Sequence, residues 1–391
     1  MRKFDENILC WCENPEDEAI DQARGIAKHP CLVGNVCLMP DTHCGYGMPI
    51  GGVVALKGAV CPNMVGVDIG CGMLAVKTSL TEISLEDLKS ILGGSENFKG
   101  GIRARIPVGF KHHNKEQESP IFEDWDRWNS TFVCRSEYNY ARKSLCTLGG
   151  GNHFIEIQKG DDGYIWFMIH SGSRNLGYKV AKHYNELAKD LCLKWKQDEV
   201  VKNDLAFLPE GTKEFQDYLN EMNLCLDYAY ENRRLMANKI KGAFLAIRHE
   251  TVFEQEINIH HNYASLEHHY SQNVFVHRKG ATLARENTIG IIPGSQGTSS
   301  YIVQGLGNKV SLCSCSHGAG RKLSRRKAVE TLDLTTEQKS LDERGILHSL
   351  RGQNSLEEAP GAYKDINIVM EEQKDLVEIL VRLEPLAVVK G

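Results

Sequence analysis

The chain has 391 residues, 41% of them hydrophobic and 25% charged, which is ordinary for a globular protein long enough for two or three domains. Its net charge of −5 excludes wholesale polyanion binding, so any nucleic-acid contact must come from local basic patches. No run approaches the ~20 apolar residues that cross a membrane, and acidic residues stand where a signal peptide has its apolar core, so we expect a cytoplasmic protein.

The expected elements are short strands and long amphipathic helices. Runs of β-branched residues between glycine-rich turns predict strands at 51–57, 73–78, 153–158, 164–170 and 274–277. Apolar residues at helical spacing predict core-facing helices over 178–196, about 214–245 and about 365–382. Strands and helices do not alternate regularly, and no linker interrupts the chain. We therefore expect a mixed α/β (α+β) fold, with sheets flanked by helices, in a single domain over residues 1–391.

The first segment with chemical potential is MPDTHCGYGMPIGG (39–52), followed by MVGVDIGCGM (64–73). Asp68 and Cys71 are three residues apart in a glycine-rich turn, where a carboxylate and a thiolate can both reach one cation. Alone this spacing is weak evidence, and a turn aspartate beside a core cysteine is the more frequent outcome. None of the 13 cysteines has the spacing of a structural zinc site.

A predicted hairpin supplies two histidines. Its strands flank the turn sequence Gly160-Asp161-Asp162-Gly163. If the hairpin is symmetric about Asp161–Asp162, His153 lies opposite His170, with Cβ atoms roughly 5 Å apart. Two neighbouring imidazoles suit a shared metal. A metal-free pair of histidines, or a bulge that shifts the register, is the alternative.

Two further polar segments are candidates for the same site. Ser171–Arg174 directly follows the hairpin as a small loop rich in donors, which suits a phosphate. His260 and His261 are adjacent in an extended segment, so their side chains face opposite sides and at most one joins a given site. Spacing does not say which one.

His317 lies in SLCSCSHGAGRKLSRRKA (311–328), at a predicted strand-to-helix transition. The small residues after it allow a ligand to approach, and a new helix N-terminus favours an anion. Arg321 would lie near His317 if the helix starts there. A histidine in such a cradle can act as a base, a metal ligand or a nucleophile. The basic residues that follow are either a solvated helix face or a contact to a polynucleotide backbone.

Nine segments together resemble the RtcB family of RNA-splicing ligases, in the order that the family shows. They are MPDTHCGYGMPIGG, VGVDIGCGM, LGGGNHFIEI, HSGSR, HHNY, IPGSQGTSSY, CSCSHGAGR, AYKDI and VVKG, and they span residues 39–391. Each alone is modest evidence, whereas their ordered combination is very specific. The first 35 residues match the family only loosely, and Cys10 and Cys12 have no role that the resemblance explains.

The resemblance implies a site for two Mn²⁺ ions. Asp68 would hold one ion, and Cys71 would bridge both. His153 and His170 would complete the shell of one ion, and His261 would serve the other. Ligand preference alone would favour zinc for such a cysteine and histidine set, so manganese comes from the resemblance.

The resemblance also implies a guanine-nucleotide site. His317 would be the nucleophile that becomes guanylylated, Arg321 would contact phosphate or orient the His317 ring, and Asp41 would lie near the incoming 5′-hydroxyl. Glu156 would read the guanine edge, since a carboxylate accepts from N1–H and the exocyclic amine. The remaining nucleotide-binding positions are Asn152, His153, Phe154, Ile155, His261, Asn262, Pro293, Gly294, Ser295, Gln296, Ser300, Gly318, Ala319, Gly320 and Lys390.

The activity implied is a GTP- and manganese-dependent RNA ligase in RNA repair or tRNA splicing. It would join 2′,3′-cyclic phosphate or 3′-phosphate ends to 5′-hydroxyl ends through histidine–GMP and RNA(3′)pp(5′)G intermediates. The expected partners are RNA and GTP, with an accessory activating protein as an optional addition, and we expect a monomer that binds no membrane. The strongest alternative is a metal-dependent phosphohydrolase that cleaves RNA or nucleotide ends without ligation. A non-catalytic RNA-binding paralogue is disfavoured by the intact ligand set.

Three positions depart from the family's usual residues. Cys146 and Asn175 stand where glycine is common, and Gln296 replaces a common methionine beside the expected nucleotide. None is a predicted metal ligand or the predicted nucleophile. We expect Cys146 to alter a turn and to leave the chemistry unchanged.

Overall fold

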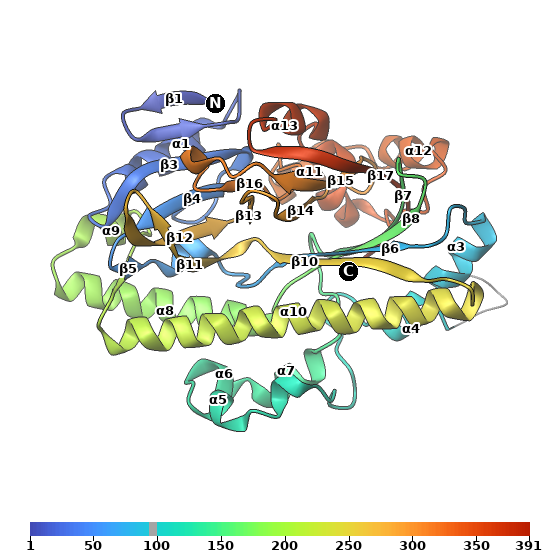
Figure 1. Cartoon of the computed structure of the whole chain (residues 1–391), viewed down its shortest axis with the longest axis horizontal. Helices are drawn as coiled ribbons and strands as arrows, with labels where there is room; N and C mark the ends of the chain where they lie inside the picture. The colour runs from blue at the N-terminus through green and yellow to red at the C-terminus, as the bar shows by residue number, and fades with distance from the viewer. Residues whose placement is uncertain (94–99) are drawn as a thin grey trace.

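Two β-sheets form the centre of the molecule in the computed structural model, which describes residues 1–93 and 100–391 (Figure 1). The first sheet has the order β1 (Arg2–Asp5), β2 (Ile8–Cys10), β3 (Leu32–His43), β4 (Ile50–Leu56), β12 (Gln272–Lys279), β11 (Asn262–His269). The second has the order β10 (Phe253–His260), β6 (Gly72–Thr78), β8 (Ile165–Ser171), β7 (Phe154–Gly160), β17 (Val377–Lys390), β15 (Ser300–Gly305), β14 (Ile289–Ile292). Two small pairs complete the strands: β13 (Ala281–Leu283) with β16 (Ser314–Ser316), and β5 (Ala59–Val60) with β9 (Leu208–Pro209).

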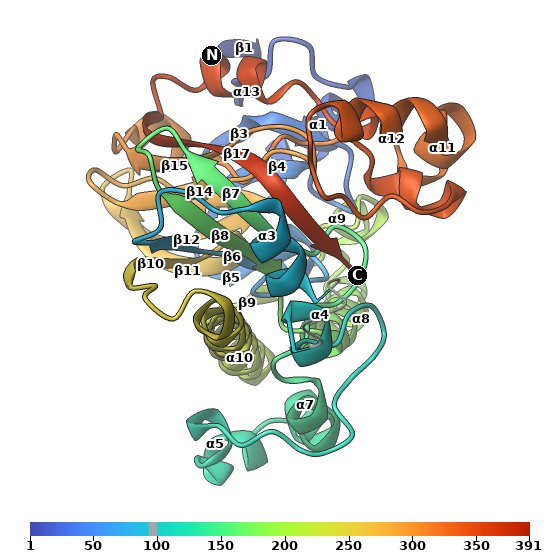
Figure 2. The same cartoon turned by 90° about the vertical axis from the view of Figure 1, so that its right-hand side faces the viewer.

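Helices cover the sheets on their outer sides. The α-helices are α1 (Asp17–Ala27), α2 (Pro62–Val65), α3 (Leu85–Leu92), α4 (Ile102–Arg105), α5 (Trp125–Asn129), α6 (Val133–Ser136), α7 (Tyr138–Ser144), α8 (Asn175–Lys194), α9 (Asp198–Lys202), α10 (Lys213–Ile247), α11 (Arg325–Thr331), α12 (Leu334–Glu343) and α13 (Ile366–Glu372). In both views α8 and α10 lie below the sheets, and α5 and α7 lie beyond them (Figures 1 and 2). The prediction of a mixed α/β fold is confirmed. No helix of the described ranges has the length and apolar character needed to cross a membrane.

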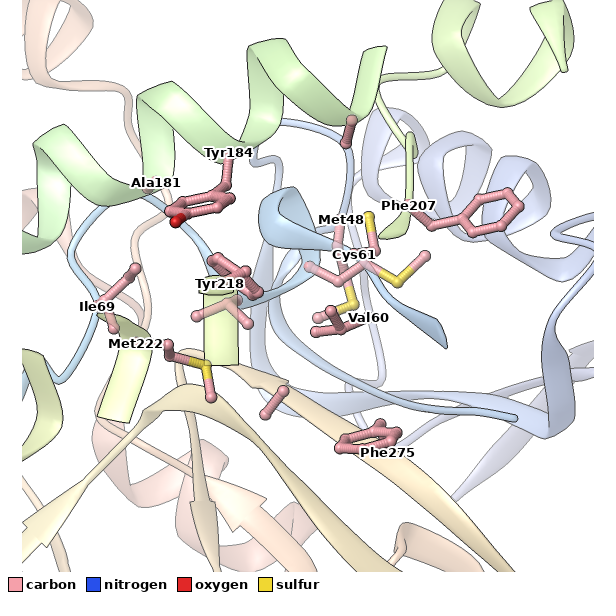
Figure 3. Packing of buried hydrophobic residues seen from close by; sticks show 14 of the residues in the cluster. Met48, Val60, Cys61, Ile69, Ala181, Tyr184, Phe207, Tyr218, Met222 and Phe275 are labelled. Atoms are coloured by element: carbon pink, nitrogen blue, oxygen red, sulfur yellow. The ribbon is translucent and has the colours of Figure 1, made fainter. Parts of the chain in front are cut away.

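The largest apolar core lies between the two long helices and the first sheet (Figure 3). Tyr184 of α8 packs against Tyr218 of α10, with ring centroids 5.3 Å apart. Met222 lies one turn further along α10, and Phe275 of β12 closes the cluster. Burying side chains of this size stabilises the fold by about 1.5–3 kcal/mol each. The helices predicted at 178–196 and 214–245 are confirmed as α8 and α10. Most of their apolar stripes are core, but Trp195, at the end of the first stripe, follows the last residue of α8 and is 41% exposed.

The third predicted helix, 365–382, is wrong in its second half. The helix α13 ends at Glu372, and β17 begins at Val377 after a short turn. Val377 is buried, but Leu380, which the helical spacing placed on the buried stripe, is 44% exposed. The chain pairs with β15 on one side and β7 on the other, and these ladder hydrogen bonds outweigh the apparent helical period.

The predicted hairpin forms as β7 and β8, but its register differs by one residue. Phe154, and not His153, lies opposite His170. The turn is centred on Asp162, whose carboxylate accepts a hydrogen bond from the Tyr164 amide at 3.2 Å. An odd number of turn residues therefore shifts the pairing, and His153 falls in the loop just before β7.

Candidate active site

A cavity of roughly 220 Å³ opens where the ends of the second sheet meet the His317 segment. Most of the predicted nucleotide-binding residues line it. They are Asn152, Phe154, Glu156, Pro293, Gly294, Ser295, Gln296, His317, Gly318, Ala319, Gly320 and Lys390, joined by Arg321 and His170. Segments that are far apart in the sequence thus converge on one space, as the resemblance implied.

Three predicted metal ligands form a tight buried cluster at one end of the cavity. The Cys71 Sγ lies 3.2 Å from the Nε2 of His170 and 3.5 Å from the Nε2 of His153. Asp68 joins the cluster, with its Oδ2 3.2 Å from the His153 Nε2. The Cys71, His153 and His170 ligand atoms all lie within 4.8 Å of one another, a spacing that one cation can span.

A row of imidazoles connects this cluster to His317. His261 lies 5.2 Å from His170, ring centroid to ring centroid, and 4.8 Å from His317. Its Nδ1 is buried without a hydrogen-bond partner. His260 points the other way, where its Nδ1 lies 3.2 Å from the Arg233 guanidinium and 3.1 Å from the Gly70 carbonyl oxygen. Of the two adjacent histidines, the one that the resemblance selected is therefore the one beside the cluster.

Burial favours the neutral form of two of these histidines, His170 and His261. It lowers the pKa of His170 and of His261 well below the ordinary value, and the neighbouring imidazoles lower both further. Burial also raises the pKa of the Cys71 thiol, and the adjacent Asp68 raises it further. Neutral imidazole is the form that binds metals, whereas the thiol must lose its proton when a cation arrives.

Asp41 fixes the orientation of His317. Its Oδ2 accepts from the His317 Nδ1 at 2.6 Å and from the His317 backbone amide at 3.1 Å. Burial raises the pKa of Asp41, but the facing His317 ring more than offsets this, and the net pKa lies below the ordinary value. An ionised carboxylate can only accept, so Nδ1 carries a proton, and in the neutral tautomer of the ring the lone pair is then on Nε2. Asp41 therefore positions the His317 ring, and its predicted place near the incoming 5′-hydroxyl stays a prediction.

Lys364 ties the Asp41 and His317 segments together. Its Nζ donates to the carbonyls of Pro40, at 3.2 Å, and Thr42, at 2.6 Å, on either side of Asp41. Its backbone amide donates to the Gly320 carbonyl at 2.9 Å. Lys364 thus holds both the backbone on either side of Asp41 and the loop that follows His317.

Two glycines permit close approaches within the site. Gly149 has φ +97°, and a Cβ there would lie 2.5 Å from the His153 Nδ1. Gly320 has φ +72°, and a Cβ there would lie 2.2 Å from the Asp41 carbonyl oxygen. A side chain at either position would add backbone strain as well as a clash.

The other end of the cavity holds charged groups in pairs. Burial raises the pKa of Glu156 to about 8, and the Gln158 amide donates to its carboxylate at 2.9 Å. The Lys390 Nζ lies 2.8 Å from the carboxylate of Glu358. Arg321 contacts the same carboxylate at 3.3 Å. This end can therefore present both an acceptor and cations to a nucleotide.

Three predicted nucleotide-binding residues support the site from outside the cavity. Ile155 is fully buried in an apolar cluster, so its side chain packs and does not face the cavity. The Ser300 hydroxyl accepts from the Gly294 amide at 3.1 Å and so shapes the Pro293 turn. Asn262 donates to the Asp68 carbonyl at 3.0 Å and positions the metal-ligand loop.

The phosphate-binding role predicted for Ser171–Arg174 is not supported by its contacts. The Ser171 hydroxyl donates to the Leu148 carbonyl at 2.7 Å, and the Ser173 hydroxyl donates to the Ile69 carbonyl. These donors are used within the fold, because they hold the Asp68 loop against the hairpin.

No helix starts directly after His317, which corrects the predicted transition. The strand β16 ends at Ser316, and α11 begins only at Arg325 with Ser324 as its N-cap. Arg321 is therefore not one helical turn from His317. Its guanidinium donates to the Glu357 carbonyl at 2.6 Å, although the residue still lines the cavity.

The three departures from the usual family residues are accommodated locally. Cys146 has φ +62°, the left-handed conformation that favours glycine, so it does occupy a glycine-type turn. Asn175 begins α8 and donates to Glu137 at 3.2 Å. Gln296 donates to the Glu358 carbonyl at 2.9 Å, and its buried Oε1 has no partner.

Several functional neighbours were not assigned from the sequence. His43, Tyr363 and Glu358 line the cavity, and Arg233 holds the metal-ligand loop from α10 by donating to the Gly70 carbonyl at 3.0 Å. His43 and Tyr363 lie inside the motifs MPDTH and AYKDI, so the motifs themselves were the available signal. Glu358 and Arg233 had none, because their role depends on partners distant in sequence. Cys12 contacts the Lys364 Nζ at 3.4 Å, which places the loosely matching N-terminal segment against the site.

A thiol and imidazole cluster that opens into a cationic cavity is typical of metal-dependent enzymes that act on phosphate compounds. The family profile described as "tRNA-splicing ligase RtcB" matches residues 22–391, and the chain belongs to the RtcB family. It is 36% identical to the RNA-splicing ligase RtcB of Escherichia coli K12, over 96% of this chain and 95% of that protein. It is 32% identical to the tRNA-splicing ligase RtcB of Nanoarchaeum equitans (96% and 92%) and 32% identical to the RNA-splicing ligase RtcB homolog 1 of Entamoeba dispar (97% and 83%).

Proposed function

We propose that this protein is a GTP- and manganese-dependent RNA ligase that joins a 2′,3′-cyclic phosphate or 3′-phosphate end to a 5′-hydroxyl end. The observation that carries the proposal is the placement of His317. It is held by Asp41 at Nδ1, lies next to His261 of the metal-ligating cluster, and lines the cavity that also contains Glu156 and Lys390. RNA repair or tRNA splicing in the cytoplasm is the setting that this activity implies.

The residues present fit two divalent cations. Asp68 lies beside His153, and His261 lies beside His170, while Cys71 contacts both hairpin histidines. We therefore assign Asp68, Cys71 and His153 to one ion, and Cys71, His170 and His261 to the other. This division differs from the expectation that His153 and His170 serve the same ion. When bound, Mn²⁺ supplies Lewis-acid stabilisation of charge on the phosphates.

His317 acts as the nucleophile of the first step. Its Nε2 lone pair attacks the α-phosphorus of GTP, a P–N bond forms, and pyrophosphate leaves. Asp41 accepts the Nδ1–H bond throughout and stabilises the positive charge that develops on the ring. Glu156 in its ionised form accepts from the guanine edge, and Lys390 and Arg321 offer cations to the nucleotide.

The later steps return His317 to its resting state. A cyclic phosphate is first opened by water to a 3′-phosphate. An oxygen of the 3′-phosphate then attacks the phosphorus of the GMP on His317, which breaks the P–N bond and gives RNA(3′)pp(5′)G. The 5′-hydroxyl of the second RNA attacks the RNA phosphate, loses its proton, and expels GMP.

Ligation of defined RNA ends tests the proposal. An RNA with a 2′,3′-cyclic phosphate and an RNA with a 5′-hydroxyl are incubated with Mn²⁺ and either GTP or ATP, with His317→Ala and the exposed-site control His249→Ala in parallel. We expect a joined product only with GTP, lost in H317A and retained in H249A. Opening or removal of the phosphate without joining, unaffected by H317A, would instead assign the site to a phosphohydrolase.

Metal preference is tested on the same reaction. Protein purified without chelator is analysed for bound metals, stripped, and reconstituted with one cation at a time. We expect activity with Mn²⁺ and inhibition by Zn²⁺, because zinc binds such ligand sets more tightly and displaces the working ion. Activity restored by zinc alone would overturn the assignment of manganese.

A further inference from the structure

Phe110, in the loop that follows α4, is a large aromatic residue left entirely in water. Its exposed fraction is 102%, the highest among the exposed aromatic residues of the same segment, where Phe132 is 72% exposed and Trp125 46%, while Phe122 and Trp128 are buried. A single exposed apolar side chain is common on protein surfaces and by itself indicates nothing. Phe110 differs from such residues in two ways: the residue before it is hydrogen-bonded to the edge of the candidate active site, and exposed basic side chains lie next to it.

The base of Phe110 is fixed to the rim of the candidate active site. The amide of the preceding Gly109 donates to the Gly149 carbonyl at 2.8 Å, and Arg174 donates to the Gly109 carbonyl at 3.1 Å. Gly149 in turn backs directly onto the predicted metal ligand His153. Gly109 contacts the glycine loop that precedes His153, and Phe110 is the next residue. Since consecutive Cα atoms lie about 3.8 Å apart, the exposed ring starts close to that loop.

The rest of the loop is held in place and carries exposed basic side chains. The His113 amide donates to the Lys143 carbonyl at 3.0 Å, and its ring lies 3.1 Å from the Cys146 carbonyl. Lys111 and Lys115 are exposed on the outer side of the loop. Glu116, the acidic residue closest to them in sequence, is paired with Arg142 at 2.6 Å. An exposed ring beside exposed cations is the pattern that binds single-stranded nucleic acid, because bases stack on the ring and phosphates face the cations.

A second basic side chain lies over the same glycine loop. The guanidinium of Arg325 is close enough to Gly151 that a Cβ there would meet it at 2.8 Å, and Arg325 lines the cavity. Gly149 and Gly151 therefore lie between Phe110 and Arg325. An RNA strand that runs over these glycines would pass from Arg325, at the cavity, to the exposed ring of Phe110.

We propose that Phe110 is a stacking platform for a nucleobase of the RNA strand whose terminal phosphate enters the cavity, with Lys111 and Lys115 facing its backbone. The inference rests on the proposed function, since it needs RNA as the substrate. It adds where the strand leaves the site and predicts that this contact tolerates any base, because every base presents a π-face.

The test measures the affinity of full-length protein for a single-stranded RNA 10-mer with a 3′-phosphate, by fluorescence anisotropy. Phe110→Ala removes the ring, and Phe110→Trp keeps a stacking surface. Phe132→Ala is the matched control, because Phe132 is also a highly exposed phenylalanine (72%) in the same segment but stacks on His183. We expect F110A to bind about tenfold more weakly, F110W and F132A to bind like the unaltered protein, and labelling by GTP to be equal in all four.

A second arm identifies the contact as base stacking. RNA that lacks the bases of its last three nucleotides should bind the unaltered protein about as weakly as intact RNA binds F110A, and F110A should not distinguish the two RNAs. Equal affinity of F110A and the unaltered protein for intact RNA would overturn the inference and leave a protein partner as the reason for the exposed ring. Loss of GTP labelling in F110A would also overturn it, because Phe110 would then act on the site itself. Absence of labelling in the unaltered protein would instead contradict the proposed function.

Discussion

The two ends of the candidate active site handle charge in opposite ways. At the Cys71 end burial lowers the pKa values of His170 and His261 and raises that of the Cys71 thiol, so these groups are neutral at rest, and the charged group among them is Asp68, whose pKa the His153 hydrogen bond lowers despite burial. At the Lys390 end the charges are present but paired, with Lys390 and Arg321 both on Glu358. The first end is therefore complete only when cations bind, whereas the second is organised before a nucleotide arrives. His317 lies between them and depends on both.

The largest expected effect comes from removing the group between the two ends. His317→Ala should reduce GTP labelling and RNA joining by at least about 10⁴-fold, because no other group supplies the nucleophile. Covalent labelling by α-labelled GTP measures the loss. Retained labelling in this variant would place the nucleophile elsewhere.

Replacing Cys71, which we assign as a ligand of both ions, should impair metal binding and leave the nucleotide-binding end of the site unchanged. Cys71→Ser should lower joining by about 10³-fold or more and reduce bound metal, measured after equilibrium dialysis against Mn²⁺. Cys313→Ser, at a half-buried cysteine outside the site, is the control. Because the pKa of the Cys71 thiol is raised and binding expels its proton, metal affinity should rise with pH up to that pKa, about tenfold per unit for the one proton released. A metal affinity in C71S equal to that of the unaltered protein would remove Cys71 from the ligand set.

Disturbing the orientation of His317 should cost less than removing it. Asp41→Asn preserves shape but no longer favours the tautomer with a free Nε2, so labelling should slow by about 10³-fold while metal binding is unchanged. Rapid-quench labelling and metal analysis measure the two effects. An unaffected labelling rate would show that Asp41 has no influence on the nucleophile.

Replacing Lys364, which holds the backbone on either side of Asp41, should have a smaller effect. Lys364→Met removes the donors to Pro40 and Thr42 and should slow labelling about tenfold, with the pH profile shifted because the Asp41–His317 pair is less well held. Lys364→Arg keeps a donor and should restore part of the rate. Equal rates and pH profiles in K364M and the unaltered protein would limit this lysine to packing.

Replacing Glu156, at the nucleotide-binding end of the site, should have the smallest effect. The pKa of Glu156 is raised to about 8 by burial, so near pH 7 roughly one in ten carboxylates is ionised before the nucleotide binds. Guanine favours the ionised form, and GTP affinity should therefore rise about tenfold between pH 6 and 7, continue to rise toward pH 8, and level off above the pKa. Glu156→Gln should flatten this rise and weaken the preference for GTP over ATP, measured by calorimetry at three pH values. A rise of equal slope in E156Q would assign the titration to another group.

The sequence predicted the site better than the elements that build it. The motifs predicted that Asp68, Cys71 and His317 lie in one region, and the structure connects them through the row of His153, His170 and His261. Their functional roles stay predictions. The hairpin register depended on whether the turn centre was Asp162 or the preceding bond, which residue identities alone do not determine. The break after α13 was missed because the apolar spacing of 365–382 fits a helix equally well, and strand pairing with β7 and β15 decides the outcome.

The unassigned partners share one physical reason. Glu358 and Arg233 are acidic and basic residues in segments without a motif. The contacts that link them to the site include partners more than 30 residues away, Lys390 and Gly70. Charge in a sequence usually indicates a solvated surface, and only the folded contacts reveal that these two are buried. Ser300 was predicted as a nucleotide-binding position because it lies within a motif. In the structure its hydroxyl accepts a hydrogen bond from a backbone amide and shapes the turn beside the cavity.

Mass spectrometry of the protein after incubation with GTP and Mn²⁺ addresses the nucleophile directly. Peptides are mapped under neutral conditions that preserve a phosphorus–nitrogen bond. We expect one GMP on the peptide that contains His317, absent when ATP replaces GTP or when chelator is added. GMP on a different residue, or an unmodified His317 in protein that still joins RNA, would contradict the assignment.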